Sequence, residues 1–477
     1  MVGGRRRTKR LAEPTGPQNA RIRKEGKVVN VKQLLLGLYL RAARPDRSRH
    51  AFIAQALMED SSGRAKLMES ICERENMRRA LKRVEANDGA PGVDGMTCRQ
   101  LRGFVIRTWQ ASKQALLDGT YRPLPVRGKE IPKPDGGMRQ LGIPAVMDRL
   151  VQQATVQPLV AIYDHTFSDS SFGYRPGRSQ AQAVERYRQH VEDGYTWVVS
   201  LDLSKFFDRV NHHRLMSRLE QRIKDRRVLK LIRAFLKSGI QLNDLVEPTE
   251  EGTPQGGPLS PLLSNIVLDE LDKELERRGL RFVRYADDIV ILVRSQKAGD
   301  RVLASITRYI TGKLKLKVNA EKSKVARPWE VKFLGHKVTR MYGATRAVTH
   351  PKTVSRFKDK IREITCRKRR VNFRVVIADL NQFMRGWLPV YGRGLSQHLK
   401  RTLNRWIVRR LKAWLLKQWR KPKTKIKNLK RLGLDHEEAM KLGNSRKRIW
   451  RVSGHYQLNF AMPQKLFTQT YGLVVLR

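Results

Sequence analysis

The sequence contains little cysteine and no long apolar run. Its three cysteines, Cys72, Cys98 and Cys366, are far apart and form no CxxC pair. They provide neither a zinc knuckle nor the disulfide framework of a secreted domain, and we expect them to be buried or inert. No apolar stretch approaches the roughly 20 residues of a membrane-spanning helix, and the early stretch 34–40 lacks a signal-peptide cleavage pattern. We expect a cytoplasmic protein with no membrane partner.

Acidic residues are scarce too. The chain has 44 Asp and Glu against 98 Lys and Arg, which gives a net charge of +54. Such an excess predicts a polyanionic partner, and nucleic acid is the usual one. Residues 351–477 carry 33 Lys and Arg but only six Asp and Glu, about half of the whole excess. No internal repeat is visible, and 477 residues suggest about three domains.

Two of these few acids are adjacent, in Tyr285-Ala286-Asp287-Asp288. Apolar and β-branched stretches at 281–284 and 289–293 flank them, which predicts a hairpin with a tight turn. Adjacent carboxylates repel each other unless a cation compensates, and Mg²⁺ is typically held by one or two carboxylates plus substrate phosphates. The alternative is a solvated turn in which Asp-Asp only favours the bend. The motif alone does not decide between them.

A third acid, Asp202, decides in favour of a metal site. It ends the apolar stretch 197–203, which has the pattern of a strand. An acid at the end of a central strand, facing a hairpin with two more, suits nucleotidyl transfer by two divalent ions. One ion activates the 3′-hydroxyl and the other stabilises the leaving pyrophosphate. We predict a catalytic centre of Asp202, Asp287 and Asp288 that uses two Mg²⁺ ions, with Mn²⁺ as a substitute.

With these blocks the chain resembles a known family, the reverse transcriptases encoded by bacterial group II introns. The resemblance covers roughly residues 66–477. It includes Phe-Gly-Tyr-Arg-Pro-Gly-Arg-Ser at 172–179, Gly-Thr-Pro-Gln-Gly-Gly at 252–257 and, in the same order as in the family, the blocks at 89–95, 131–139, 141–144, 202–210, 258–266, 285–288 and 333–335. It implies an enzyme, an RNA-directed DNA polymerase, which takes dNTPs as substrates.

The resemblance also implies an α+β fold of the right-hand polymerase type. We expect fingers and palm, with an antiparallel palm sheet, over residues 66–345. An α-helical thumb or maturase domain should follow over 350–440, and a small basic DNA-binding module over 441–477. Residues 1–65 match no known block; their first part, rich in Arg and Lys among Gly and Pro, reads as a disordered basic arm.

Several substrate contacts come from the resemblance. Lys133 and Arg139 flank a Pro-Asp-Gly-Gly turn and should bind the triphosphate, as Lys and Arg suit phosphate chemically. The alternative for them is a pair of ordinary surface cations. The resemblance gives Phe207 as the steric gate against a 2′-hydroxyl, although Phe206 or Phe207 should belong to the core. The remaining roles are Leu203 as a further metal ligand, Gln255 at the nucleotide, Lys322 near the phosphates, and Phe333, Leu334 and Gly335 as a primer-positioning loop.

The basic C-terminal part predicts nucleic-acid contacts. Residues 401–420 read as a helix in which tryptophans alternate with cations, as suits base stacking with phosphate contact. For the tryptophans a place in the core is the better interpretation. Residues 380–387 resemble the family's maturase-specific domain, and 443–451 resemble the start of its DNA-binding segment. The candidate contacts are Arg385, Trp387, Arg405, Arg409, Arg410, Lys417, Arg446, Lys447 and Arg448.

We therefore expect the RNA-directed DNA polymerase and maturase of a mobile group II intron. It would bind the intron RNA to assist splicing, and copy it at target DNA by target-primed reverse transcription, associated with the nucleoid when bound there. Many family members end in a nuclease with paired cysteines, which this sequence lacks, so we expect no second-strand cleavage. The alternatives are a splicing cofactor with vestigial polymerase activity and a related enzyme recruited to host defence or repair.

Overall fold

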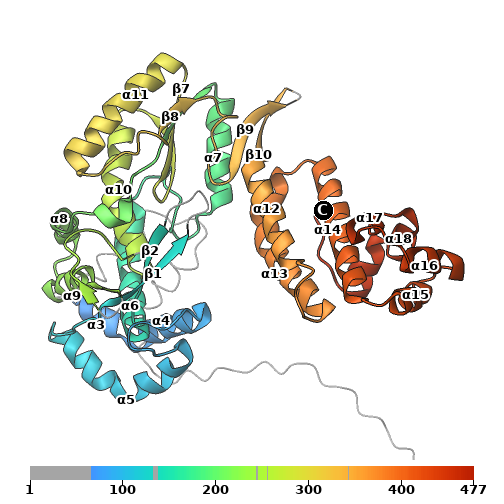
Figure 1. Ribbon diagram of the computed structural model, residues 1–477. Helices are drawn as coiled ribbons and strands as arrows, with labels where there is room; N and C mark the ends of the chain where they lie inside the picture. Colours follow the sequence, from blue (N-terminus) through green and yellow to red (C-terminus); the bar gives the residue numbers. More distant parts are fainter. Residues whose placement is uncertain (1–65, 133–137, 243–244, 255, 342) are drawn as a thin grey trace, which may run out of the picture.

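The computed structural model describes residues 66–132, 138–242, 245–254, 256–341 and 343–477. The predicted basic arm, 1–65, lies outside these residues. Figure 1 shows two units, an N-terminal unit built around a four-stranded sheet and a C-terminal helical unit that begins with α12 (Pro351–Ile364). No helix in the described part is long and apolar enough to cross a membrane.

The central sheet has the strand order β6-β7-β3-β8, and all its pairs are antiparallel. Its strands are β3 (Trp197–Leu201), β6 (Arg281–Tyr285), β7 (Asp288–Val293) and β8 (Lys324–Ala326). The predicted hairpin and central strand are confirmed. Six of the seven buried apolar residues of β6 and β7 are valine, isoleucine or leucine, which suit a sheet packed on both faces.

Alternation along the strands divides the interior of the N-terminal unit into two cores. Val199, Leu201 and Ile291 point into the larger core, which α10 (Ser260–Arg277) and other helices fill. Val198 and Val290 point to the opposite face, where α7 (Gln180–Glu192) and β9 (His336–Met341) pack. Because side chains alternate at every residue, this register also fixes where the acids at the strand ends lie.

The N-terminal unit also contains a second sheet and further helices. A second sheet has the order β2-β1-β4-β5, in which β1 (Val126–Pro132) and β2 (Met138–Ile143) form the predicted hairpin. Their turn, 133–137, lies outside the described residues. The other elements are α3 (Leu67–Cys72), α4 (Arg74–Asn87), α5 (Cys98–Leu117), α6 (Val146–Tyr163), η1 (Asp164–Thr166), η2 (Phe206–Arg209), α8 (His212–Arg222), α9 (Arg226–Leu236), β4 (Ile240–Leu242), β5 (Leu245–Glu247), α11 (Gln296–Tyr309) and η3 (Ile310–Leu314).

The hairpin of β9 (His336–Met341) and β10 (Ala344–Thr349) leads into the C-terminal helical unit. The predicted helix 401–420 is α14, which starts at Gln397 because the Ser396 hydroxyl caps it. One hydrophobic core runs through this unit from Val354 to Leu476. Its other elements are α13 (Phe373–Tyr391), η4 (Gly392–Gly394), α15 (Pro422–Arg431), α16 (His436–Gly443), α17 (Ile449–Val452), α18 (Tyr456–Ala461) and η5 (Leu466–Thr470).

Candidate active site

The hairpin turn between β6 and β7 carries two of the predicted acids. Tyr285 pairs with Asp288, so only Ala286 and Asp287 form the loop. Ala286 has φ 57°, whereas Asp287 is not left-handed. A positive φ at the first loop position alone is typical of a type II′ turn, which usually has glycine there. The alanine is therefore held in a strained conformation at the tip that presents Asp287.

The strand register brings Asp202 next to this turn. Leu201, the last residue of β3, pairs with Ile289 of β7, and one further step in the same register sets Asp202 opposite Asp288. The backbone of Asp202 is fixed on both sides: its carbonyl accepts from Asn319 at 2.8 Å, and its N–H donates to the Ser323 hydroxyl at 3.1 Å. The structure thus brings together the three predicted acids.

Leu203 follows Asp202 in an isolated antiparallel bridge with Val318. The hydrogen bonds around this bridge use the carbonyl of Asp202 and the N–H of Ser204, which donates to the Lys317 carbonyl at 2.7 Å. The bridge therefore does not engage the carbonyl of Leu203. This is compatible with its predicted part in a metal site, which remains a prediction.

The three acids influence one another electrostatically. Burial, together with the negative charges of Asp287 and Asp202, raises the pKa of Asp288 from 3.8 to about 6, and Lys332 partly opposes this rise. The Asp288 side chain still has an exposed side, so solvent screens part of this effect and a cation can reach the carboxylate. The centre therefore carries negative charge that the described side chains compensate only in part.

The residues fit a divalent cation by their chemistry. Carboxylate oxygens are preferred ligands of Mg²⁺. Within the described ranges, however, no three His, Cys, Asp or Glu side chains are already arranged around a common metal position. Carboxylates that repel one another are expected to stand apart until a cation joins them. We take the acids as donors for a metal whose binding would draw them closer.

A buried arginine next to the turn holds it in place. Arg284 of β6 is fully buried, and its Nε donates to Asp272 of α10 at 2.7 Å, in a two-pronged ion pair. Its remaining nitrogen donates to Asn265 at 2.9 Å and to the carbonyl of Ala286 at 3.1 Å. The guanidinium thereby ties the strained loop residue to helix α10.

The block 172–179 supports the same turn from the other side. The backbone of Arg284 bonds to Ser170 and Phe172, each at 2.9 Å, and Asn265 donates to the Gly173 carbonyl at 2.9 Å. A Cβ on Gly173 would lie 2.3 Å from the backbone nitrogen of Ala286. Only glycine allows so close an approach, which explains the residue at this position of the motif.

The structure distinguishes the two candidate gate residues. Phe206 is 3% exposed and belongs to the larger core, while Phe207 is half-buried at its edge. The Phe207 carbonyl accepts from Thr253 at 2.6 Å, so the Gly-Thr-Pro-Gln-Gly-Gly loop starts beside it. This favours Phe207 as the residue that faces the substrate, as predicted.

The structure describes the other predicted nucleotide contacts only in part. Lys133 and Gln255 lie outside the described residues. Arg139 belongs to β2 and pairs with Ile131, but its side chain is also outside the described part. Lys322 is exposed in the segment whose neighbours Asn319 and Ser323 bond to Asp202. These four assignments remain predictions.

The predicted primer-positioning loop is a tight turn between the two units. Phe333 and His336 exchange both backbone hydrogen bonds, and Leu334 and Gly335 have φ of 49° and 77°. This is the pattern of a type I′ turn, in which leucine is strained. Phe333 is buried, and a Cβ on Gly335 would lie 2.6 Å from the ring of Tyr391 in α13. Of the three residues, only half-buried Leu334 still has a side chain available to a ligand.

The predicted nucleic-acid contacts of the C-terminal helical unit divide by exposure. Exposed positions are occupied by Arg385, Arg405, Lys417, Arg446, Lys447 and Arg448. Trp387 is 9% exposed and packs on Phe357 and Tyr391 in the core, which argues against its predicted stacking role. Arg409 lies over Trp450, and Arg410 donates to Thr365, so both have partners inside the unit.

One cation of α14 was misjudged from its helical pattern. Lys412, which the pattern of the helix predicts among the cations that contact phosphate, is only 3% exposed, and its ammonium group donates to Asn459 at 2.8 Å. Burial lowers its pKa to about 8. Trp414, by contrast, is buried as the sequence favours.

The sequence did not reveal the residues that support the acids. Arg284 reads as an ordinary strand residue, and Asp272 and Asn265 as polar positions of a helix. The one available signal was that Asn265 and Asp272 are seven residues apart, two helical turns, on one face of a predicted helix. Lys332, which lowers the pKa of Asp288, sits just before the predicted primer loop and was also missed.

Comparisons with known proteins identify the family. Residues 131–338 match the family model for reverse transcriptase (RNA-dependent DNA polymerase), and residues 354–433 match the maturase-specific domain of group II introns. Protein YkfC of Escherichia coli K12 is 34% identical over 328 residues, which cover 60% of this chain and 86% of YkfC. The chain belongs to the group II intron reverse transcriptase and maturase family. Its N-terminal unit is accordingly that of an RNA-directed DNA polymerase.

Other relatives match over a smaller share of their length. The group II intron-encoded protein LtrA of Lactococcus lactis is 35% identical over 254 residues, which cover 53% of this chain and 41% of LtrA. A putative COX1/OXI3 intron 2 protein of Saccharomyces cerevisiae is 31% identical over 273 residues, or 45% of this chain and 32% of that protein. A solved partial Cas6-RT-Cas1–Cas2 complex superposes with a TM-score of only 0.33 at 25% identity, over 51% of this chain and 42% of that chain.

The buried arginine generates the first prediction. In Arg284→Lys the charge remains, but the two-pronged bond to Asp272 and the bond to Ala286 cannot form together. We expect the protein to fold, and the rate of cDNA synthesis to fall about 100-fold, because a displacement of about 1 Å at a catalytic group has that effect. Steady-state extension kinetics at saturating dNTP measure it. The exposed Arg277 of α10 provides the control, Arg277→Lys, and equal rates for both variants would contradict a positioning role.

The raised pKa of Asp288 generates a second prediction. Since the folded-state pKa lies above the ordinary value, the protonated carboxyl contributes stability below pH 4, and this contribution is lost as the pH rises through about 6. Mg²⁺ should therefore raise the melting temperature more at pH 7.5 than at pH 5. Asp288→Asn should remove this difference, as measured by thermal melting with and without Mg²⁺. The same Mg²⁺ shift at both pH values would contradict it.

Proposed function

We propose that this protein is the polymerase and maturase of a group II intron, which binds the intron RNA and copies it into DNA at a target site. The observation that carries the proposal is the meeting of Asp202, Asp287 and Asp288 at one edge of the central sheet. Family membership supports it. In this interpretation the N-terminal unit supplies fingers and palm, and the C-terminal helical unit is the thumb.

Each residue then has a defined part in nucleotide addition. Asp202, Asp287 and Asp288, together with the Leu203 carbonyl, would hold the two divalent ions. When bound, two divalent ions lower the pKa of the primer 3′-hydroxyl and neutralise the leaving pyrophosphate. Arg284 acts as a positioning residue, because it fixes the turn on which two of the acids lie.

The substrate is oriented by the surrounding loops. Lys133 and Arg139 bind the triphosphate, and Gln255 contacts the nucleotide from the loop that starts beside Phe207. The ring of Phe207 excludes a 2′-hydroxyl. Leu334 and Gly335 set the primer end, at the junction with the thumb. The exposed cations Arg385, Arg405, Lys417, Arg446, Lys447 and Arg448 contact phosphates of intron RNA and target DNA.

The catalytic assignment is tested by Asp287→Ala. Loss of this carboxylate should abolish Mg²⁺-dependent cDNA synthesis on an RNA template, while affinity for RNA stays within about twofold because the basic surface is unchanged. Primer extension and filter binding measure the two properties. Asp208→Ala, which alters an exposed acid six residues after Asp202, is the control. Normal extension by Asp287→Ala would refute the site.

The gate is tested by Phe207→Val. The smaller side chain should admit ribonucleotides, and the ratio of kcat/KM for dNTP over rNTP should fall by about tenfold or more, since each 1.4 kcal/mol of lost discrimination is tenfold. Phe206→Leu is the matched control: it should lower thermal stability and leave that ratio unchanged, because Phe206 lies in the core. A larger change in selectivity for Phe206→Leu would reverse the assignment.

A further inference from the structure

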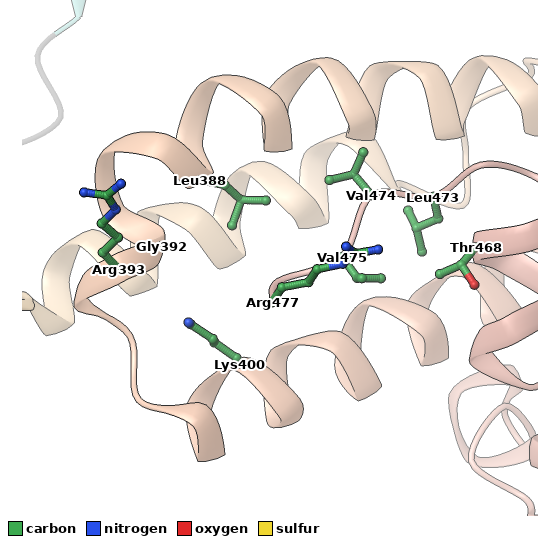
Figure 2. Close-up of a pocket in the computed structure, with 9 residues that line it drawn as sticks. All are labelled: Leu388, Gly392, Arg393, Lys400, Thr468, Leu473, Val474, Val475 and Arg477. Carbon is green, nitrogen blue, oxygen red and sulfur yellow. The ribbon is translucent and has the colours of Figure 1, made fainter.

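A cavity of about 560 Å³ lies in the C-terminal helical unit, between the end of α13, the start of α14 and residues 473–477 (Figure 2). Three cations line it, each from a different segment: Arg393, Lys400 and Arg477. Its apolar lining comes from Leu388, Leu473, Val474 and Val475. No Asp or Glu side chain is among the described residues that line it.

Two asparagines build one wall of this cavity. Asn381 of α13 donates to the Gly472 carbonyl and accepts from the Val474 N–H, each at 2.8 Å. Asn404 of α14 likewise donates to the Leu476 carbonyl at 2.9 Å and accepts from its N–H at 3.0 Å. A side-chain amide thus pairs twice with the backbone at each end of the segment, as a neighbouring strand would. The wall is fixed before any ligand arrives.

This anchoring decides which side chains face the cavity. Leu476 points into the hydrophobic core and is 4% exposed, while Leu473 belongs to the same core, is 5% exposed and borders the cavity. Val474 and Val475 remain half-buried and Arg477 exposed, on the side that lines the cavity. The segment therefore offers a rigid apolar wall next to a cation.

The cations are arranged for more than one anionic group. In Figure 2, Arg393 and Lys400 lie toward one end of the cavity, and Arg477 extends along its wall beside Val475. Their ends do not converge on one point, so they would not clamp a single phosphate. None of them forms an ion pair among the described residues. Like charges around one hollow repel each other, and successive phosphates would offset that repulsion.

We propose that this cavity binds a short single-stranded segment of nucleic acid, with successive phosphates at the three cations and sugars or bases on the wall of Leu388, Val474 and Val475. A positively charged groove that tracks the backbone next to apolar surface is how single strands are held without sequence preference. The proposal rests on the proposed function, since it locates one RNA or DNA contact of the thumb.

The double variant Arg393→Gln with Lys400→Gln tests it. Affinity for a 12-nucleotide single strand is measured by fluorescence anisotropy at several salt concentrations, with RNA and DNA of one sequence. Each lost phosphate contact should reduce the slope of log K against log salt by about 0.7, so the double variant should lose about 1.4. The control is Lys297→Gln with Arg301→Gln, which removes two exposed cations of α11. Equal slopes for the two double variants would overturn the proposal.

A second variant keeps the outcome decisive if the first folds poorly. Val475→Glu sets a carboxylate on the half-buried wall and leaves Leu473 and Leu476 in the core. It should weaken binding of the single strand several-fold, and binding of a blunt duplex of equal length much less. Binding of free mononucleotide in place of the strand, or an equal loss for strand and duplex, would contradict a single-strand site.

A separate measurement distinguishes a defect at this cavity from a defect at the polymerase centre. The Arg393 and Lys400 double variant should extend a saturating, pre-annealed primer on RNA by one nucleotide at the normal rate. Asp287→Ala should fail there and keep its salt slope. Failure of the cavity proposal is therefore visible as an unchanged slope, and failure of the proposed function as normal extension by Asp287→Ala.

Discussion

The buried ion pair of Arg284 with Asp272 is the interaction on which the turn with Asp287 and Asp288 depends. A fully buried arginine is costly to remove from water, and only a complete set of partners offsets that cost. Here Asp272, Asn265 and the Ala286 carbonyl use its donors, so the strand cannot shift along α10 without leaving a charge unpaired. Because β6 is fixed in this way, the strained turn and its two acids keep their position relative to β3.

The same constraint permits the site to hold repelling charges. The negative charges of Asp202 and Asp287 raise the pKa of Asp288, and this repulsion alone would favour movement of the turn away from β3. The arginine pair and the close contact with Gly173 oppose that movement. Bound divalent cations would relieve the repulsion that remains between the carboxylates. The chain as a whole has a net charge of +54 and attracts phosphate, whereas this small acidic centre repels it locally.

The two units depend on each other through a few tight contacts. The turn at Leu334 and Gly335 leaves the central sheet, packs under Tyr391 of α13 and accepts hydrogen bonds from His350 and Thr353 at 2.9 Å. A strained leucine in a type I′ turn persists only where its surroundings hold it. The distance between the acids and the basic helical unit is consequently set by this turn. Nucleic acid held by the cations of one unit can therefore be presented reproducibly to the carboxylates of the other.

The sequence by itself determined the local elements and the chemistry. Apolar and β-branched stretches predicted the strands that flank Asp202 and Asp288, and the order of the motifs indicated the family, because such stretches and short motifs are properties of neighbouring residues. Only the tertiary structure decided which side chains of the C-terminal helices are exposed. Lys412 and Trp387 lie in the same kind of local sequence as their exposed neighbours, but both face the core. It also decided that Arg284, Asp272 and Asn265 support the turn. These residues are far apart or inconspicuous in sequence, and their role follows from burial, which the fold as a whole determines.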